Sequence, residues 1–322
     1  MRTVLGATVT LMGGFALAAC GGDGSSAGAA EATVVVTTNI LGDVVQTLVG
    51  DGAHVEVLMP PGSNPHDFAP SAKQAVAMRA ADLLVVNGGG FEAGLVDTIE
   101  SAEADGVAVL VATDALEAPA RVGGDEGTDD HGLGTDGHEP ESSVGQTDPH
   151  FFTDPVLMHG VVEQLADGLA ERLDDLDTPE FRQRVDDYLG QLDQLTADVT
   201  ATLDPLPKER RLLVTNHDEL GSFAARFHFD VLGVIIPGGS TLAEPSAAAL
   251  ADLADDIEAA AVPAIFAETS SPARLAEALA AEGADVEVVE IYAESLGGPD
   301  SGASTYLDMV RTNAERIAAA LG

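Results

Sequence analysis

The stretch 179-PEFRQRVDDYLGQLDQLTADVTATLDPLP-207 decides the expected fold, because it predicts one long helix in the middle of the chain. Apolar residues recur through it at steps of three and four, the spacing of one helix face: Phe181, Val185, Tyr188, Leu189, Leu192, Leu195, Val199 and Leu203. Pro179 suits a first helical turn, and Pro205 and Pro207 stop the helix. About 25 helical residues would extend roughly 37 Å, the diameter of a small domain, so we expect a rigid strut between two lobes.

Short β-branched runs alternate with helical patterns on both sides of this helix, which is the signature of βαβ units on a parallel sheet. Before it, the expected strands are 33–37, 54–58, 83–86 and 108–111, and the expected helices lie near 40–49, 71–81 and 91–104. After it, the expected strands are 212–215, 231–236, 264–267 and 286–289, with helices near 219–227, 246–260, 272–282 and 304–321. The sequence therefore predicts an α/β protein whose two βα lobes have mainly parallel sheets joined by one long rigid α-helix.

The N-terminal residues indicate export. Arg2 precedes an apolar run from Val4 to Ala19, which is shorter than the roughly 20 residues of a membrane-spanning helix. We interpret 1–20 as a signal peptide and the Gly/Ser/Ala-rich 21–32 as a flexible tether. The alternative to a lipoprotein signal is an ordinary signal peptide with a stray cysteine.

Cys20 is the residue that favours the lipoprotein. It is the only cysteine, and Leu17-Ala18-Ala19-Cys20 resembles the bacterial lipobox, whose cysteine becomes the lipid-modified first residue. We therefore expect an extracytoplasmic protein anchored to the cell membrane through Cys20, without a disulfide or a thiolate metal cluster. The expected domains are an N-terminal lobe over 33–177, a linker helix over 178–204 and a C-terminal lobe over 205–322, together forming a monomer.

The charge of the chain limits its partners. Lys and Arg number 14 against 54 Asp and Glu, a net charge of -40, which argues against nucleic acid or anionic lipid as a ligand. Such a field attracts cations, but acidity of this kind also keeps a protein soluble in salt. The charge alone therefore leaves the ligand open.

Four loops that follow expected strands or precede expected helices carry a side chain able to bind metal. Such loops lie where ligands bind in α/β folds. The candidates are His66 in Asn64-Pro65-His66-Asp67-Phe68, His150 in Asp148-Pro149-His150-Phe151, His217 in Asn216-His217-Asp218-Glu219, and Glu294 in Tyr292-Ala293-Glu294-Ser295-Leu296. Three imidazoles and one carboxylate would form a four-coordinate site that suits Zn²⁺ and accepts Mn²⁺ or Fe²⁺ less selectively.

These motifs, in this order, together with Phe223 and Tyr306, resemble the zinc and manganese solute-binding proteins of ABC importers (the ZnuA/TroA-like, or cluster A-I, family of metal-binding lipoproteins). The similarity runs from about residue 33 to the C-terminus. It implies a metal ion between two lobes, bound by His66, His150, His217 and Glu294, and delivered to an ABC permease with its cytoplasmic ATPase. Glu294 departs from the usual aspartate, and the histidine at 217 favours zinc, since manganese-binding relatives usually carry a carboxylate there.

The acidic, glycine-rich segment 121–147 has too few apolar residues to offset the entropy of ordering, so it is expected to be a mobile loop. It lies where zinc-binding relatives carry a histidine-rich insertion. Its His131 and His138 suggest an accessory metal-gathering loop, and a solvated spacer fits the composition equally well.

Alternative functions start from the same residues. A zinc hydrolase would need an open coordination position and a general base such as Glu219 or Asp218, and the chain has no HExxH. We therefore expect no enzyme. A Mn²⁺- or Fe²⁺-specific binding protein and a metal-linked surface adhesin remain alternatives.

Several further residues are expected to be structural. Gly88-Gly89-Gly90 would let a loop turn tightly rather than bind a dinucleotide. His54, His159 and His228 are interpreted as structural or surface residues. Glu268 is expected to be a solvated carboxylate at the start of a helix; its resemblance to a glutamate that recurs near the cleft in this family implies a cleft-lining role as the alternative.

Overall fold

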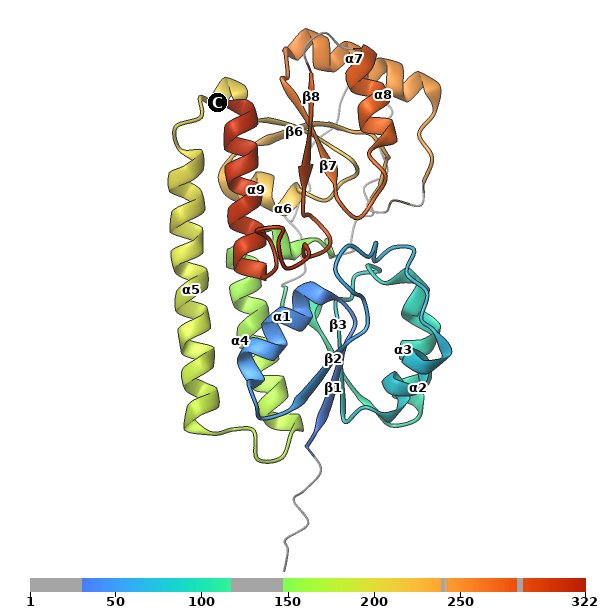
Figure 1. The fold of residues 1–322 in the computed structure, drawn as a ribbon, viewed down its shortest axis with the longest axis vertical. Helices are drawn as coiled ribbons and strands as arrows, with labels where there is room; N and C mark the ends of the chain where they lie inside the picture. Colours follow the sequence, from blue (N-terminus) through green and yellow to red (C-terminus); the bar gives the residue numbers. More distant parts are fainter. Residues whose placement is uncertain (1–30, 117–146, 239–240, 242, 283–285) are drawn as a thin grey trace, which may run out of the picture. The chain divides into compact units, whose positions relative to one another are not determined.

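The computed structural model describes residues 31–116, 147–238, 241, 243–282 and 286–322. Ala32–Gly322 forms one compact unit. It contains two four-stranded parallel sheets separated along the chain by a long helix, which confirms the predicted fold class. Figure 1 shows the strands of the two sheets pointing toward each other.

The N-terminal sheet has the strand order β2-β1-β3-β4. Its elements are β1 (Thr33–Val36), α1 (Asn39–Val49), β2 (His54–Val57), α2 (Ala72–Ala80), β3 (Leu83–Val86), α3 (Val96–Ala104) and β4 (Ala108–Val111). The C-terminal sheet repeats this pattern as β6-β5-β7-β8. Its elements are β5 (Leu212–Thr215), α6 (Gly221–Phe227), β6 (Asp230–Val234), α7 (Ala247–Ala260), β7 (Ala264–Glu268), α8 (Arg274–Glu282), β8 (Glu287–Ile291) and α9 (Tyr306–Leu321).

The long helix α5 (Pro179–Leu203) begins and ends where its sequence predicts. The hydroxyl of Thr178 accepts a hydrogen bond from the amide of Phe181 and caps the helix, while Pro179 fills the first position, where no amide donor is needed. The predicted apolar face is buried apart from Leu189, which is half-buried. A second helix, α4 (Pro155–Arg172), packs beside α5.

Alternation along the strands explains the layers. Val34 and Val36 face one side of the first sheet and Val35 the other, because successive strand residues point to opposite faces. Phe266 and Ile265 divide in the same way between the faces of the second sheet. In Figure 1, α2 and α3 cover the outer face of the N-terminal sheet, and α7 and α8 cover the outer face of the C-terminal sheet.

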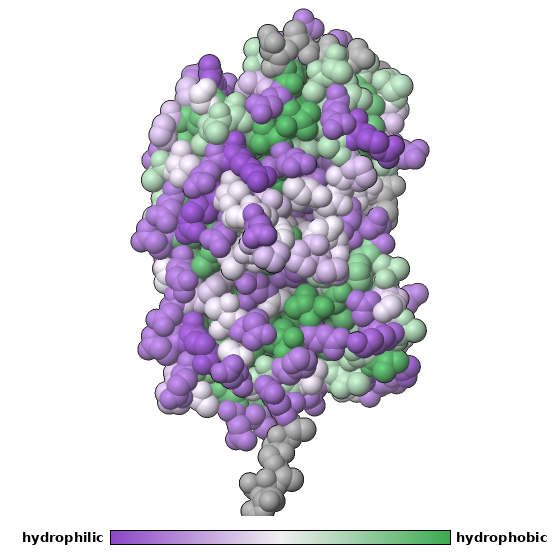
Figure 2. All heavy atoms as spheres, viewed as in Figure 1, coloured by the Kyte–Doolittle hydropathy of each residue, from purple (hydrophilic) through white to green (hydrophobic). Residues whose placement is uncertain are grey.

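The inner faces of both sheets share one apolar core with α1, α4, α5 and α9. Figure 1 shows α5 running beside α4 at the level of the N-terminal sheet and beside α9 at the level of the C-terminal sheet. Figure 2, in the same view, shows hydrophilic residues along the side formed by α5, with hydrophobic patches over the two sheets. Because the core is continuous, α5 is packed into both lobes rather than bridging them through solvent.

None of the helices within the described ranges combines the length and apolar character needed to cross a membrane.

Candidate metal centre

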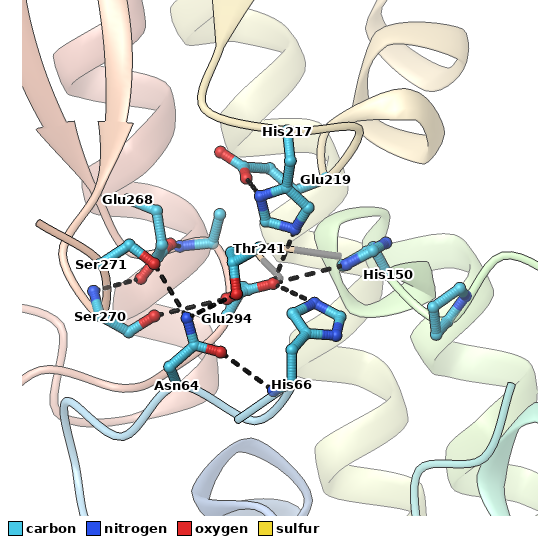
Figure 3. A network of polar contacts seen from close by, with 12 residues as sticks. Asn64, His66, His150, His217, Glu219, Thr241, Glu268, Ser270, Ser271 and Glu294 are labelled. Carbon is cyan, nitrogen blue, oxygen red and sulfur yellow. Dashed lines mark hydrogen bonds and ion pairs between the residues drawn. The ribbon is translucent and has the colours of Figure 1, made fainter. Parts of the chain in front are cut away.

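The four predicted ligand side chains lie together between the two sheets. Ligand atoms of His66, His150, His217 and Glu294 all fall within 4.8 Å of one another. The four residues are 0–2% exposed. Figure 3 shows the three imidazole rings directed at the carboxylate of Glu294.

The topology explains this convergence. His66 follows β2 and His150 precedes α4, whereas His217 follows β5 and Glu294 follows β8. Carboxyl ends of parallel strands meet at one edge of a sheet, and the ligand-bearing edges of the two sheets face each other. Each lobe therefore contributes two side chains to the cluster.

His66 and His150, the two histidines of the N-terminal lobe, are each held by a turn of the same kind. The side-chain oxygen of Asn64 accepts a hydrogen bond from the amide of His66 at 2.9 Å, and that of Asp148 accepts one from the amide of His150 at 2.9 Å. Asn and Asp commonly bind the backbone two residues ahead in this way. In each motif a proline, which has a fixed φ, stands between the Asn or Asp and the histidine. The Asn-Pro-His and Asp-Pro-His backbones are therefore rigid and hold the imidazoles in place.

The Oε1 atom of Glu294 lies amid the three rings. It is 2.6 Å from Nε2 of His66, 2.8 Å from Nε2 of His217 and 3.6 Å from Nε2 of His150. Ligand bonds of about 2.0–2.2 Å in a tetrahedral site put donor atoms roughly 3.3 Å apart. The observed distances bracket that value, so a small withdrawal of the carboxylate would admit a four-coordinate ion.

Two ring nitrogens also suit a ligand. Nε2 of His150 and Nε2 of His217 are buried, and both face the same oxygen of Glu294, at 3.6 and 2.8 Å. With Nε2 of His66, three buried imidazole nitrogens converge on this one oxygen, which indicates a binding site rather than ordinary hydrogen-bond pairing. A divalent cation is the partner that neutral imidazoles and a carboxylate would share.

The electrostatics couple metal binding to proton release. Burial disfavours the charged form of His217, but Glu219 and Glu294 outweigh it and raise the pKa of His217 to about 10. Burial also opposes the charge on His150, and hydrogen bonding to Asp148 and Glu294 raises its pKa. Burial would raise the pKa of Glu294, yet hydrogen bonding to the three histidines holds that pKa well below its usual value. Protons therefore compete with metal for the imidazoles.

Glu268 corrects one expectation. It ends β7, is 2% exposed, and accepts hydrogen bonds from the amides of Ser270 at 2.7 Å and Ala293 at 2.5 Å. Burial, together with the charges of Glu294 and Glu219, raises the pKa of Glu268 to about 8. The expected solvated carboxylate is wrong, because Glu268 instead anchors the backbone next to Glu294.

The three glycines after β3 form a tight turn, as predicted. Gly88, Gly89 and Gly90 have φ values of 84°, 64° and 81°, and a Cβ on Gly88 would lie 2.4 Å from Val111. The buried carboxylate of Glu92 fastens the turn by accepting hydrogen bonds from the amides of residues 87 and 88. The turn places the ring of Phe91 5.1 Å from that of His66 and 5.5 Å from that of His150, which gives the site an apolar wall.

The remaining candidates lie away from this cluster or outside the described residues. His54 and His228 are exposed, and His159 is half-buried in α4. Cys20, His131 and His138 fall outside the described residues, as do the segments 1–20 and 121–146. Glu219 was considered only as a general base, yet it is buried and its carboxylate contacts Nδ1 of His217. Nothing in the local pattern Asp218-Glu219-Leu220 indicates that the second acidic side chain faces inward.

Comparison with known proteins adds independent observations. Residues 34–320 match the model of a family described as zinc-uptake complex component A, periplasmic (ZnuA). The chain is 31% identical over 293 residues to the zinc-binding protein TroA of Treponema pallidum, covering 89% of this chain and 88% of that protein. It is 26% identical over 326 residues to the manganese-binding lipoprotein MntA of Halalkalibacterium halodurans, covering 100% and 99%.

A solved structure of periplasmic zinc-binding protein TroA from Treponema pallidum superposes with a TM-score of 0.79 and 30% identity, covering 91% of this chain and 99% of that one. The named relatives thus agree on a metal-binding protein and differ in the metal.

Proposed function

This chain belongs to the family of periplasmic zinc-uptake components, and from that premise we propose that it captures Zn²⁺ outside the cytoplasm and hands it to an ABC permease with its cytoplasmic ATPase. Proteins of this family are solute-binding components of metal uptake rather than enzymes. The proposal concerns the ion, the ligands and the way the ion is held.

The ligand set is the observation that carries the choice of zinc. His66, His150, His217 and Glu294 offer three nitrogens and one oxygen in a buried cluster. Imidazole suits zinc, whereas manganese prefers sites richer in oxygen ligands. Four protein ligands also favour a closed binding site over a catalytic one, which would keep a position open for water.

Manganese is the second candidate, and the full-length similarity to a manganese-binding lipoprotein supports it. Glu294 offers two oxygens, and the carboxylate of Glu268 lies close enough to influence it electrostatically. Metal competition separates the two proposals.

Interlobe hydrogen bonds support capture by a preformed site. The side-chain amide of Asn39 donates to the hydroxyl of Ser295 at 2.9 Å, and its oxygen accepts from the amide of Leu296 at 2.7 Å. The side chain of Asn64 reaches Ser271 at 2.9 Å while also holding the His66 turn. With α5 packed along both lobes, release is proposed to follow displacement of a ligand on docking to the permease, rather than wide opening of the lobes.

We further propose a monomer anchored to the membrane by lipid on Cys20. The lipobox-like residues Leu17-Ala18-Ala19-Cys20 support the anchor, and the described residues supply four ligands from one chain.

Metal analysis of the purified protein tests the proposal. The metal-stripped chain is equilibrated with equimolar Zn²⁺ and Mn²⁺, separated from free metal, and its bound metal is measured. We expect one zinc per chain and little manganese. Retention of manganese against equimolar zinc would instead support the second candidate, and absence of both metals would contradict a metal-uptake role.

A further inference from the structure

Glu219 is a fully buried carboxylate that the four-ligand site does not use. It is 0% exposed, and it contacts Nδ1 of His217. The other ring nitrogen, Nε2, lies 2.8 Å from Oε1 of Glu294. Figure 3 shows Glu219 on the side of the His217 ring opposite Glu294. The imidazole therefore lies between two carboxylates, one in the ligand cluster and one behind it.

Few local interactions explain why this carboxylate is buried. Apart from the contact with Nδ1 of His217, neither oxygen of Glu219 accepts a hydrogen bond within the described residues. The backbone turns sharply here, since the amide of Glu219 and the hydroxyl of Thr215 both donate to the carbonyl of His217, at 2.9 and 2.7 Å. Burying a carboxylate with so few donors is unfavourable, so its position beside His217 calls for an explanation beyond packing.

The same arrangement recurs in the other lobe. Oδ1 of Asp148 lies 3.0 Å from Nδ1 of His150, and Nε2 of that ring is directed at Glu294. Asp148 also accepts hydrogen bonds from the amide of His150 and the hydroxyl of Ser222, and its side chain is 43% exposed. Glu219 is thus the more deeply buried of two carboxylates placed behind ligand imidazoles.

We propose that Glu219 is a positioning residue for the metal: it accepts the Nδ1 proton of His217 and thereby holds the ring with its Nε2 lone pair toward the ion. A histidine that binds metal through one nitrogen commonly donates the other N–H to a carboxylate, which fixes the tautomer and orients the ring. The inference rests on the proposed function, because it assigns Glu219 a role at that same site.

Three test substitutions and one control separate positioning from packing. Glu219→Met keeps the length and unbranched shape of the side chain but offers no good acceptor. Glu219→Gln keeps an acceptor oxygen, so it should rescue part of the effect. Asp148→Asn alters the comparable but half-exposed carboxylate, and Glu100→Met, at an exposed position in α3, is the matched control.

The zinc affinity of each variant is measured in competition with a chelator, and we expect the following order. Glu219→Met should weaken zinc binding by about 10- to 100-fold, the usual effect of losing an outer-sphere partner. Glu219→Gln should weaken it less, Asp148→Asn should weaken it less than Glu219→Met, and Glu100→Met should leave it unchanged.

Stability of the metal-free variants gives a second readout. Glu219→Met removes one partner of a buried carboxylate–imidazole pair, which is destabilising because the other partner is left unpaired. Metal-free Glu219→Met should therefore melt below the wild-type temperature, and it should also bind zinc more weakly. A lowered melting temperature with unchanged zinc affinity would show a packing role and overturn the proposal.

Nitrogen-15 NMR of the zinc-loaded wild-type protein tests the idea without any variant. The His217 ring should carry its proton on Nδ1 and show a metal-bound Nε2. A proton on Nε2, or metal on Nδ1, overturns the inference. If the wild-type protein binds no zinc, the proposed function fails first; if it binds zinc and the Glu219 variants match wild type, only this inference fails.

Discussion

The Nε2 atom of His66 lies 2.6 Å from Oε1 of Glu294, although 228 positions separate the two residues. This contact joins the loop after β2 in the first lobe to the loop after β8 in the second. The ligand cluster thus also connects the two lobes. Substitutions in the cluster should therefore affect both metal binding and the stability of the fold.

Removing an imidazole should abolish tight zinc binding. His66→Ala is expected to weaken zinc affinity by more than the roughly 10- to 100-fold that loss of an outer-sphere partner costs, because a direct ligand is lost. His159→Ala, a half-buried histidine of α4, is the control. Isothermal calorimetry measures both, and intact affinity after combined loss of His66, His150 and His217 would refute the site.

The charge of Glu294 should matter more than the length of its side chain. Glu294→Gln places a neutral amide among the three rings, whereas Glu294→Asp retains a carboxylate. We expect the glutamine variant to bind zinc more weakly than the aspartate variant in a chelator competition. Equal affinities would argue that Glu294 is not a direct ligand.

Zinc affinity should rise with pH well above neutrality. An imidazole must lose its proton to bind metal, and the pKa of His217 is about 10 instead of about 6.5. Binding at pH 7 should therefore release at least one proton per zinc, and affinity should fall continuously from about pH 9 to pH 6. Calorimetry in buffers of different ionisation enthalpy counts the protons; a count of zero would contradict this prediction.

The metal-free protein should show the opposite trend in stability. His217 binds its proton more tightly when folded, so its contribution is fully present below about pH 6.5 and is lost as pH rises toward 10. Glu268, with a pKa of about 8, acts in the same direction, its contribution being lost as pH rises through 8. The melting temperature in chelator should fall between pH 6.5 and 9, and His217→Ala should flatten the slope. A rising melting temperature in wild type would show that other groups dominate.

Asn39 should stabilise the junction between lobes. Its side chain makes hydrogen bonds to Ser295, Leu296, Met59 and Pro60 in a buried position. Asn39→Ala should lower the free energy of unfolding by about 2 kcal/mol, since several buried groups lose a partner. Urea unfolding measures this change, with the exposed Gln46→Ala as control. Zinc should also dissociate faster from the Asn39 variant. An unchanged dissociation rate would show that the hydrogen bonds of Asn39 between the lobes do not help to retain the metal.

The elements that sequence predicts well are those with strong local signals. The apolar face of α5 and its flanking prolines determine that helix, and alternating β-branched runs mark the strands. Boundaries differ where local geometry intervenes: the helix expected over 91–104 begins only at Val96, because the glycine turn and a short 3₁₀ segment precede it.

The candidate ligands were predictable because each lies in a loop beside an expected strand or helix and because their motifs resemble those of a known family. Asn64 and Asp148 each stand two residues before a histidine, and that spacing sets the turns. Glu219 and Glu268 were not predictable, since an acidic side chain in a loop normally faces water. Their burial depends on contacts with His217 and with the backbone near Glu294, which only the tertiary structure brings close.

The apolar core shared by both sheets also constrains how such a protein can be divided. A fragment ending before α5 would expose the apolar faces of α1 and α4 that α5 covers, and the complementary fragment would expose the matching face of α5. Neither half should be soluble or fold independently, so cutting the chain near Leu176 ought to yield aggregates rather than two modules.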